Sequence, residues 1–331
     1  MNGRPELESA RLSVELWVNG RAAAFPESLA DIVRTSLGAN EAYESKTVWI
    51  SCEISGEEDI SSRRPVQDAL RAALTKTPLP PGVQAILHGS FATGAVTPFS
   101  DVDIVLIFDE NLDPREAPRL RASAAALLRV MYRTAPLAHH GLTVIFRGEL
   151  DRYDQSVLPL AALEQGLHLS GAAMTLPVRW DPALSRSGAR DRFKRQLAAT
   201  KRNFRNHSGF LYRRQSALSV LMLLPSLLLE SVDGVFPYKR DSFALAKDRF
   251  RPEEWAAIEE ATDIRRNWHL PPRLTRAASF LNSAESLLDP ETARKLTGAL
   301  AWDPGKTWND ALPASSFRFI KRCEEMLHAR R

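Results

Sequence analysis

Two aspartates, Asp101 and Asp103, open an apolar run that continues to Phe108. In an extended strand, residues i and i+2 project from the same face, with Cα atoms about 6–7 Å apart. Two carboxylates at this spacing can share or bridge a hard divalent cation such as Mg²⁺ or Mn²⁺, which also takes oxygen ligands from phosphate and water. The pair therefore predicts a site at which a cation holds a phosphate compound.

A Gly-Ser pair, Gly89-Ser90, closes a separate apolar run that begins at Val83. A glycine lets the backbone approach a ligand closely, and amides at the start of a following helix can hold a phosphate beside the Ser90 hydroxyl. The alternative is a buried strand whose aspartates cap its exposed start, which leaves the Gly-Ser turn unexplained. A phosphate turn and a carboxylate pair together predict a site for a nucleoside triphosphate.

Residues 88–108, with the sequence HGSFATGAVTPFSDVDIVLIF, resemble the nucleotidyltransferase superfamily that includes DNA polymerase β. The resemblance extends at most from Gln84 to Gly148. It implies an α+β fold, in which a small mixed-sheet nucleotidyltransferase core precedes an all-helical domain and the active site lies in the cleft between them. The superfamily also includes CCA-adding enzymes, cyclic-dinucleotide synthases and aminoglycoside-modifying enzymes. The acceptor therefore stays open: an RNA end, a small molecule, a protein or a second nucleotide.

The reaction implied by this resemblance moves a nucleoside monophosphate from a nucleoside triphosphate, such as ATP, to an acceptor hydroxyl and releases pyrophosphate. Asp101 and Asp103 would hold Mg²⁺ or Mn²⁺ in a two-metal site that stabilises the attacking and leaving oxygens together. Gly89 and Ser90 would hold the β- and γ-phosphates. A magnesium-dependent transferase is the activity that we expect.

The third carboxylate that usually completes such a site is missing from the corresponding strand, residues 142–146, which reads LTVIF. The pair His139-His140 precedes this strand, and a neutral imidazole can accept a proton, so His140 is a candidate base. The alternative is that the two histidines form a turn at the strand entry. Acidic residues follow only in the loop beyond: Glu149, Asp151 and Asp154. The missing acid leaves a second function open, a catalytically impaired relative that binds a nucleotide or a nucleic acid.

A later segment, residues 234–243, interrupts the helical pattern with the sequence GVFPYKRDSF. Members of the superfamily often bring basic or hydroxyl side chains from the helical domain onto the triphosphate or the base. Lys239, Arg240 and Ser242 are candidates for that role by position. The alternative is a surface loop in which Asp241-Ser242 caps the next helix.

The pattern of apolar residues divides the chain into three parts. Residues 1–62 form an α+β appendage, residues 63–156 the catalytic domain and residues 157–331 the helical domain. In the appendage, alternating apolar residues over 12–18 before Asn19-Gly20 predict a strand and a hairpin turn. Further elements are expected as a helix at 28–37, a strand at 48–54, helices at 65–75 and 114–133, and a strand at 142–146.

After about Val157 strand signals largely vanish. Helices are expected at 157–168, 190–206, 215–231, 252–266, 272–287, 290–301 and 315–329. Asp289-Pro290 is a good helix start, with Asp as the N-cap and Pro at the first helical position.

The formal net charge of +4 is unevenly distributed. Residues 186–214 contain ten basic residues and one acid, so this segment carries +9 and the rest of the chain −5. Such a segment can bind polyphosphate or nucleic acid, or it can be a solvated helix face beside acidic neighbours. It has no series of aromatic residues for base stacking.

Two cysteines far apart in the sequence, Cys52 and Cys323, offer no disulfide framework or ligand spacing, which favours a reducing cytoplasm. The first residues lack the apolar segment of a signal peptide. The strongest apolar run, 217–229, is too short to span a bilayer and contains Pro225. We therefore expect a cytoplasmic enzyme with no membrane partner.

Overall fold

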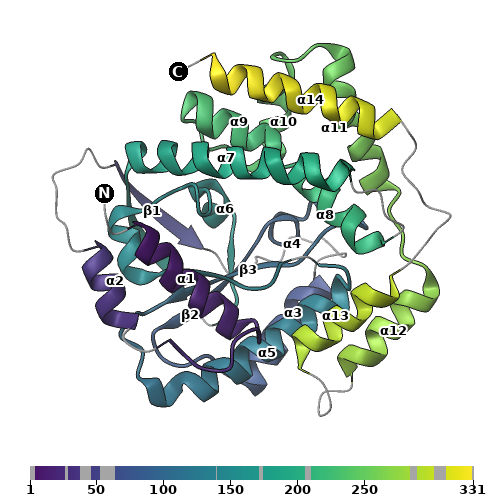
Figure 1. The fold of residues 1–331 in the computed structure, drawn as a ribbon. Coiled ribbons are helices and arrows are strands. Elements are labelled where there is room, and N and C mark those ends of the chain that lie inside the picture. Colours follow the sequence, from purple (N-terminus) through teal and green to yellow (C-terminus); the bar gives the residue numbers. More distant parts are fainter. Residues whose placement is uncertain are drawn as a thin grey trace.

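A four-stranded mixed sheet lies in the middle of the molecule (Figure 1). Its order is β4-β3-β2-β5, formed by Thr143–Phe146, Asp103–Phe108, Val83–His88 and Leu167–His168. β2 is antiparallel to β3 and to β5, whereas β3 and β4 are parallel. This computed structural model describes residues 4–26, 29–37, 46–52, 64–138, 140–170, 174–205, 210–283, 289–301 and 311–329. The predicted α+β fold with a small mixed sheet is confirmed.

The elements before residue 181 build and cover this sheet. The helices there are α1 (Arg4–Val18), α2 (Leu29–Leu37), α3 (Arg64–Lys76), α4 (Ser90–Thr93), α5 (Ala117–Thr134) and α6 (Leu160–Glu164). Two 3₁₀ turns are η1 (Pro114–Glu116) and η2 (Arg147–Arg152). A second sheet pairs β1 (Lys46–Cys52) with β6 (Met174–Trp180) in antiparallel register.

Both faces of the main sheet are buried, because alternate side chains along each strand enter two different cores. On one face, Leu87 and Leu106 pack in a core that includes apolar residues of α1, α3 and α5. On the other face, Ile86 and Val105 pack with residues of α6, β1 and β6. Asp103 is two residues before Val105, so its side chain leaves the strand on this second face.

The predicted strand over residues 12–18 is wrong, because these residues lie in helix α1. The buried residues of α1 recur at helical spacing, as Ala10, Val14, Trp17 and Val18, whereas Leu12 is exposed. Gly20, with φ of +76°, ends the helix instead of making a hairpin turn, and the amide of Arg21 donates back to the carbonyl of Leu16.

The predicted helix over 157–168 and the expected loss of strands after Val157 are also wrong. Only α6 is helical there, and it is followed by β5 and β6. Leu176, Val178 and Trp180 alternate along β6, and Pro177 is tolerated because β1 is the one strand that pairs with β6 at this position among the described residues. Part of the predicted strand over 48–54 is β1, and residues 53 and 54 lie outside the described residues.

The remaining helices form most of the second half of the chain. They are α7 (Pro182–Arg205), α8 (Leu211–Leu221), α9 (Leu224–Asp233), α10 (Lys239–Lys247), α11 (Pro252–Arg266), α12 (Pro272–Ser283), α13 (Pro290–Leu300) and α14 (Ala311–His328). The single helix expected over 215–231 is wrong, because α8 ends before Pro225, which stands in the first turn of α9. Asp289 caps α13 as predicted, and its Oδ1 accepts from the amide of Thr292.

Residues 211–233 contain an 18-residue stretch that is apolar enough by composition to span a membrane, with mean hydropathy 1.5. However, 72% of this stretch is buried inside the protein, as in a core helix. α7, α8, α9, α11 and α14 share one apolar core. α12 and α13 instead return to the core domain and pack on α5 (Figure 1).

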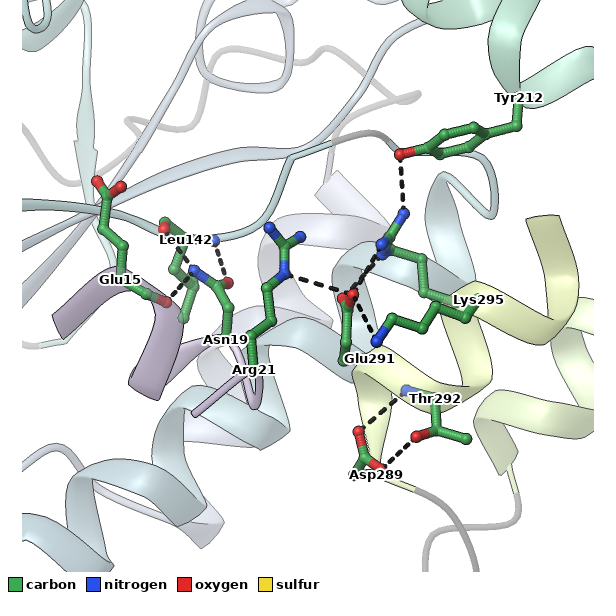
Figure 2. A network of polar contacts seen from close by, with 10 residues as sticks. Glu15, Asn19, Arg21, Leu142, Tyr212, Asp289, Glu291, Thr292 and Lys295 are labelled. Atoms are coloured by element: carbon green, nitrogen blue, oxygen red, sulfur yellow. Dashed lines mark hydrogen bonds and ion pairs between the residues drawn. The ribbon is translucent and has the colours of Figure 1, made fainter. Parts of the chain in front are cut away.

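Glu291 of α13 completes this return. Its carboxylate forms ion pairs with Arg21, from the segment after α1, and with Arg294 (Figure 2). The guanidinium of Arg294 also donates to the hydroxyl of Tyr212 in α8. The predicted division of the chain at residues 62 and 156 stays a prediction.

Candidate active site

Asp101 and Asp103, at the start of β3, both lie close to the imidazole of His140. The Nε2 atom of His140 lies 3.3 Å from Oδ1 of Asp103 and 3.6 Å from Oδ2 of Asp101. Asp101 is buried, whereas the side chain of Asp103 is partly exposed. One oxygen of each carboxylate therefore points toward the same place, as the i, i+2 spacing of the sequence predicts.

Parallel pairing brings His140 to the aspartates. Val105 of β3 is paired with Thr143 of the parallel strand β4, so the residues that precede the two strands lie at the same end of the sheet. His140 stands where the sequence analysis expected a base, and its neighbour His139 lies outside the described residues. His88, at the end of β2, lies opposite Asp103 in the antiparallel register of β2 and β3, and burial lowers the pKa of its imidazole.

The Gly-Ser turn packs directly against Asp103. Gly89 has φ of +73°, and a Cβ atom at this position would lie 2.5 Å from Oδ2 of Asp103. Ser90 begins the single turn of α4, and the hydroxyl of Thr93 at its end donates to the carbonyl of Gly89. Only glycine fits this turn, because both its backbone conformation and its contact with the carboxylate exclude a side chain.

Two basic side chains from the helical region lie within electrostatic range of the aspartates. The pKa of Lys239 is lowered to about 8, mainly by burial and also by the charge of Arg265, against the opposing attraction of Asp103 and Asp101. Burial also lowers the pKa of Arg265, against the attraction of Asp101. The guanidinium of Arg265 lies 4.9 Å from the centre of the Phe99 ring. A pair of partly desolvated cations beside two carboxylates suits a polyanion that is bound with a cation.

The other two candidates from this segment are placed differently. The residues expected to form a loop begin helix α10 at Lys239, so Ser242 lies inside the first turn and does not cap a following helix. Its buried hydroxyl donates to the carbonyl of Lys239. Arg240 is exposed, and its guanidinium lies 3.6 Å from Asp241. Of the three candidates, Lys239 is the one that interacts with the aspartates.

Three further residues interact with this site and are not predicted by the sequence. Nε2 of Gln215, in α8, donates to Oδ1 of Asp101 over 2.8 Å, and both side chains are buried. Tyr238 precedes α10 and its hydroxyl is hydrogen-bonded to Thr93 of the Gly-Ser turn. Arg265 is the third. All three come from the helical region more than 100 residues after the aspartates, so no local pattern identifies them.

Acidic residues beyond β4 do not complete the site. Glu149 is buried, with one oxygen paired to Arg11 and the other accepting from the amide of Phe146. Asp154 accepts from the amide of Ser156. Over the residues that the structure describes, no group of three or more His, Cys, Asp and Glu side chains is arranged to hold a metal ion.

The carboxylate pair nevertheless fits a hard cation that is bound together with its substrate. Mg²⁺ is commonly held by one or two carboxylates, with phosphate and water oxygens completing its shell. The converging oxygens of Asp101 and Asp103 supply two such ligands, and the cations of Lys239 and Arg265 suit the phosphates that would supply others. These groups suit a metal ion that would share its ligands with a triphosphate.

Comparison with known families agrees with this geometry. Residues 69–133 match the model of a family described as a nucleotidyltransferase domain. The match begins in α3 and includes the Gly-Ser turn, both aspartates, β3 and most of α5. No curated protein matches the chain. Residues 69–133 are therefore similar to a nucleotidyltransferase domain, which confirms the resemblance predicted from the sequence.

Proposed function

We propose that this protein is a metal-dependent nucleotidyltransferase, which transfers a nucleoside monophosphate from a nucleoside triphosphate to an acceptor hydroxyl. The observation that carries the proposal is the convergence of Asp101 and Asp103 on His140 beside the Gly89 turn. The family match supports a nucleotidyltransferase, and the carboxylate pair supports the use of Mg²⁺ or Mn²⁺. Bound to the two carboxylates, the cation would neutralise charge on the phosphates and on the attacking oxygen.

The proposed reaction is an in-line displacement at the α-phosphorus. The acceptor oxygen forms a bond to this phosphorus while the bond to the bridging oxygen of pyrophosphate breaks, and pyrophosphate leaves with that electron pair. The hydroxyl proton passes to the imidazole of His140, whose Nε2 lies 3.3 Å from Asp103 and 3.6 Å from Asp101. Lys239 and Arg265 bind oxygens of the β- and γ-phosphates, and the Gly89 backbone and Ser90 hold them from the sheet side.

The acceptor in this proposal is any compound that presents a hydroxyl group. An RNA end, a small molecule, a protein side chain and a second nucleotide all do so, and the experiment below distinguishes them. The alternative, a nucleotide-binding relative without turnover, is not favoured because the Gly89 turn and both aspartates are intact.

Labelled triphosphates test the proposal directly. The full chain is incubated with each α-labelled ribo- and deoxyribonucleoside triphosphate, with Mg²⁺ or Mn²⁺, in the presence of RNA, of small hydroxyl compounds or of protein alone. We expect one combination to yield a labelled product with an equal amount of pyrophosphate. Asp103→Asn should abolish both signals.

The matched control is Asp113→Asn, since Asp113 is a partly exposed carboxylate at the start of η1. It should transfer at the wild-type rate. Equal rates in wild type and Asp103→Asn would contradict the proposed site, and tight triphosphate binding without any transfer would favour the binding module.

A further inference from the structure

Strand β4, which brings His140 to the aspartates, is an edge strand of the main sheet. An edge strand has backbone amides that no neighbouring strand accepts, and buried amides need other partners. Three amides at alternate positions, those of Leu142, Val144 and Phe146, all donate to side-chain oxygens. Side chains therefore replace the missing strand along this edge.

Helix α1 and Asn19, the residue that follows it, supply or hold these oxygens from one face. Oδ1 of Asn19 accepts from the amide of Leu142 over 2.7 Å, and Oε1 of Glu15 accepts from the amide of Val144 over 3.0 Å. Arg11 holds Glu149, whose other oxygen accepts from the amide of Phe146 over 2.7 Å. Four residues of helix rise about 6.0 Å and two residues of strand about 6.6 Å, so residues 11, 15 and 19 match alternate positions of β4.

Asn19 differs from Arg11 and Glu15 because its side chain both donates to and accepts from the backbone of the strand. Its Nδ2 donates to the carbonyl of Leu142 over 2.9 Å, while its Oδ1 accepts from the amide of the same residue (Figure 2). Nδ2 also donates to the carbonyl of Glu15, and the Asn19 side chain is 4% exposed. The amide group thus fixes the backbone of Leu142 as a neighbouring strand would.

The residue between this contact and the histidine is a glycine that leaves no free space. A Cβ atom at Gly141 would overlap the amide group of Asn19. The backbone from His140 to Leu142 therefore packs directly against the buried side-chain amide of Asn19. Leu142, which this amide holds, is two residues from His140, whose imidazole lies 3.3 Å from Asp103. A change in the position of Leu142 would move His140 away from the carboxylates.

We propose that Asn19 is a positioning residue of the active site, which holds the start of β4 so that His140 faces Asp101 and Asp103. This inference rests on the proposed function, since it assigns the N-terminal helix a part in the same reaction. It gives a role to an element that the family match does not include. A merely structural role would use the same paired amide, because buried backbone groups need partners, so the test needs a readout at His140 as well as stability.

Two variants test the contact from its two sides, and one controls for stability. Asn19→Ala removes the paired amide, and Gly141→Ala pushes a methyl group into it. Val14→Ala lies on the same helix and removes buried methyl groups from the same core without changing any partner of β4. All three should lower the melting temperature, so the melting temperature by itself does not decide.

The deciding measurement without turnover is the NMR signal of the His140 ring in the full chain, together with hydrogen exchange of the Leu142 amide. Asn19→Ala and Gly141→Ala should shift the ring signal and accelerate exchange at Leu142 relative to the amides of β3. Val14→Ala should leave both at wild-type values. Unchanged signals in Asn19→Ala, or the same changes in Val14→Ala, would overturn the inference.

The measurement with turnover is a split between kcat and KM. Asn19→Ala should lower kcat by about tenfold or more, because small displacements of a reacting group are costly, and leave KM for the triphosphate within about twofold. In a His140→Ala background, Asn19→Ala should have no further effect on kcat. Multiplying effects would overturn the inference. If the wild type transfers nothing, the proposed function fails, and the His140 signal alone then decides whether Asn19 positions the ring.

Discussion

Nε2 of Gln215 donates to Oδ1 of Asp101 over 2.8 Å, between side chains that are 114 residues apart and both buried. The bond ties α8 of the helical region to the carboxylate at the start of β3. It leaves Oδ2 of Asp101 directed toward His140 and Asp103. One oxygen of Asp101 is thus held by the helical region, and the other faces the expected cation.

Removal of this bond should weaken both folding and catalysis. Gln215→Leu removes one donor from the buried carboxylate of Asp101, and hydrogen bonds to charged groups contribute about 1.5–3 kcal/mol to stability. We expect kcat/KM to fall by about tenfold or more. Gln215→Glu should lower the melting temperature without metal, by repulsion of Asp101, and Mg²⁺ should restore part of the loss.

Arg213→Gln is the control for both variants, because Arg213 is an exposed residue of the same helix. It should keep the wild-type kcat/KM and the wild-type response of the melting temperature to Mg²⁺. If Gln215→Leu matches this control in both measurements, the bond to Asp101 has no part in the reaction.

The contact between Gly89 and Asp103 makes a second prediction. Gly89→Ala places a methyl group 2.5 Å from a carboxylate oxygen and forces a side chain into φ of +73°. Gly94→Ala, at the other end of α4, is a milder backbone control, because its φ of +76° and ψ of 4° lie in the left-handed helical region, whereas Gly89 has ψ of −154°, which is essentially restricted to glycine. Both should lower the melting temperature, whereas only Gly89→Ala should abolish transfer. Full activity in Gly89→Ala would show that Asp103 can move without consequence.

Nucleotide binding should be visible in thermal stability. A ligand that binds only the folded state raises the melting temperature by mass action. A triphosphate with Mg²⁺ should therefore stabilise the wild type, and the double variant Asp101→Ala, Asp103→Ala should lose most of that gain. The same shift in both proteins would mean that the nucleotide binds elsewhere, for example along residues 186–214.

The extent to which the sequence predicts this site depends on the distance between its parts. Gly89, Ser90, Asp101 and Asp103 lie close together in the sequence, so a local pattern contains their geometry, and parallel pairing then brings His140 beside them. Gln215 and Arg265 reach Asp101 only through the tertiary packing of α8 and α11. No spacing in the sequence encodes such contacts.

Helix α1 shows a different limit. The apolar residues from Leu12 to Val18 alternate as in a strand, and Asn19-Gly20 is typical of a hairpin turn. The spacing of Arg11, Glu15 and Asn19 is four residues, which indicates one face of a helix, but polar residues at this spacing usually indicate solvent exposure. Their burial against the edge of β4 depends on the sheet and could not be predicted from α1 itself.

A buried acid gives a prediction for the pH dependence of stability. Burial raises the pKa of Glu230 to about 7, with a smaller effect of Asp154 in the same direction and an opposing one of Arg192. The folded protein therefore binds a proton more tightly than the unfolded chain, in which the ordinary pKa is 4.5. The stability contributed by this proton is present below pH 4.5 and is lost as the pH rises through about 7.

Glu230→Gln keeps the shape of the side chain without the charge. Its melting temperature should exceed that of the wild type increasingly between about pH 5 and pH 8. Other buried acids, such as Glu149, are the same in both proteins and cancel in the difference. Glu253→Gln, at an exposed position of α11, should give a constant difference over this range. A constant difference for Glu230→Gln as well would mean that Glu230 is already ionised at low pH.

The basic segment, residues 186–214, is partly occupied by contacts within the protein. Arg192 donates to the carbonyl of Ser156, and Lys201 is paired with Glu324. Its exposed members on α7 include Arg195, Arg202 and Arg205. A nucleic-acid partner for this segment stays a proposal, and these three exposed arginines are suited to test it while the pair of Lys201 with Glu324 stays intact.

If these arginines bind phosphates, affinity for RNA or DNA should fall steeply with salt, because each neutralised phosphate releases condensed counterions. Reversal of all three to Glu should then weaken binding and flatten the slope of log affinity against log salt, by roughly 0.7–0.9 for each phosphate that the variant no longer neutralises. Affinity for a free triphosphate should change little, since Lys239 and Arg265 are unaltered. Lys201→Glu is the matched reversal at a paired position, and it should affect stability more than the salt slope. If the wild type binds nucleic acid weakly and the triple variant matches it, the segment is a solvated helix face, because charge without stacking aromatic residues gives little affinity at physiological salt.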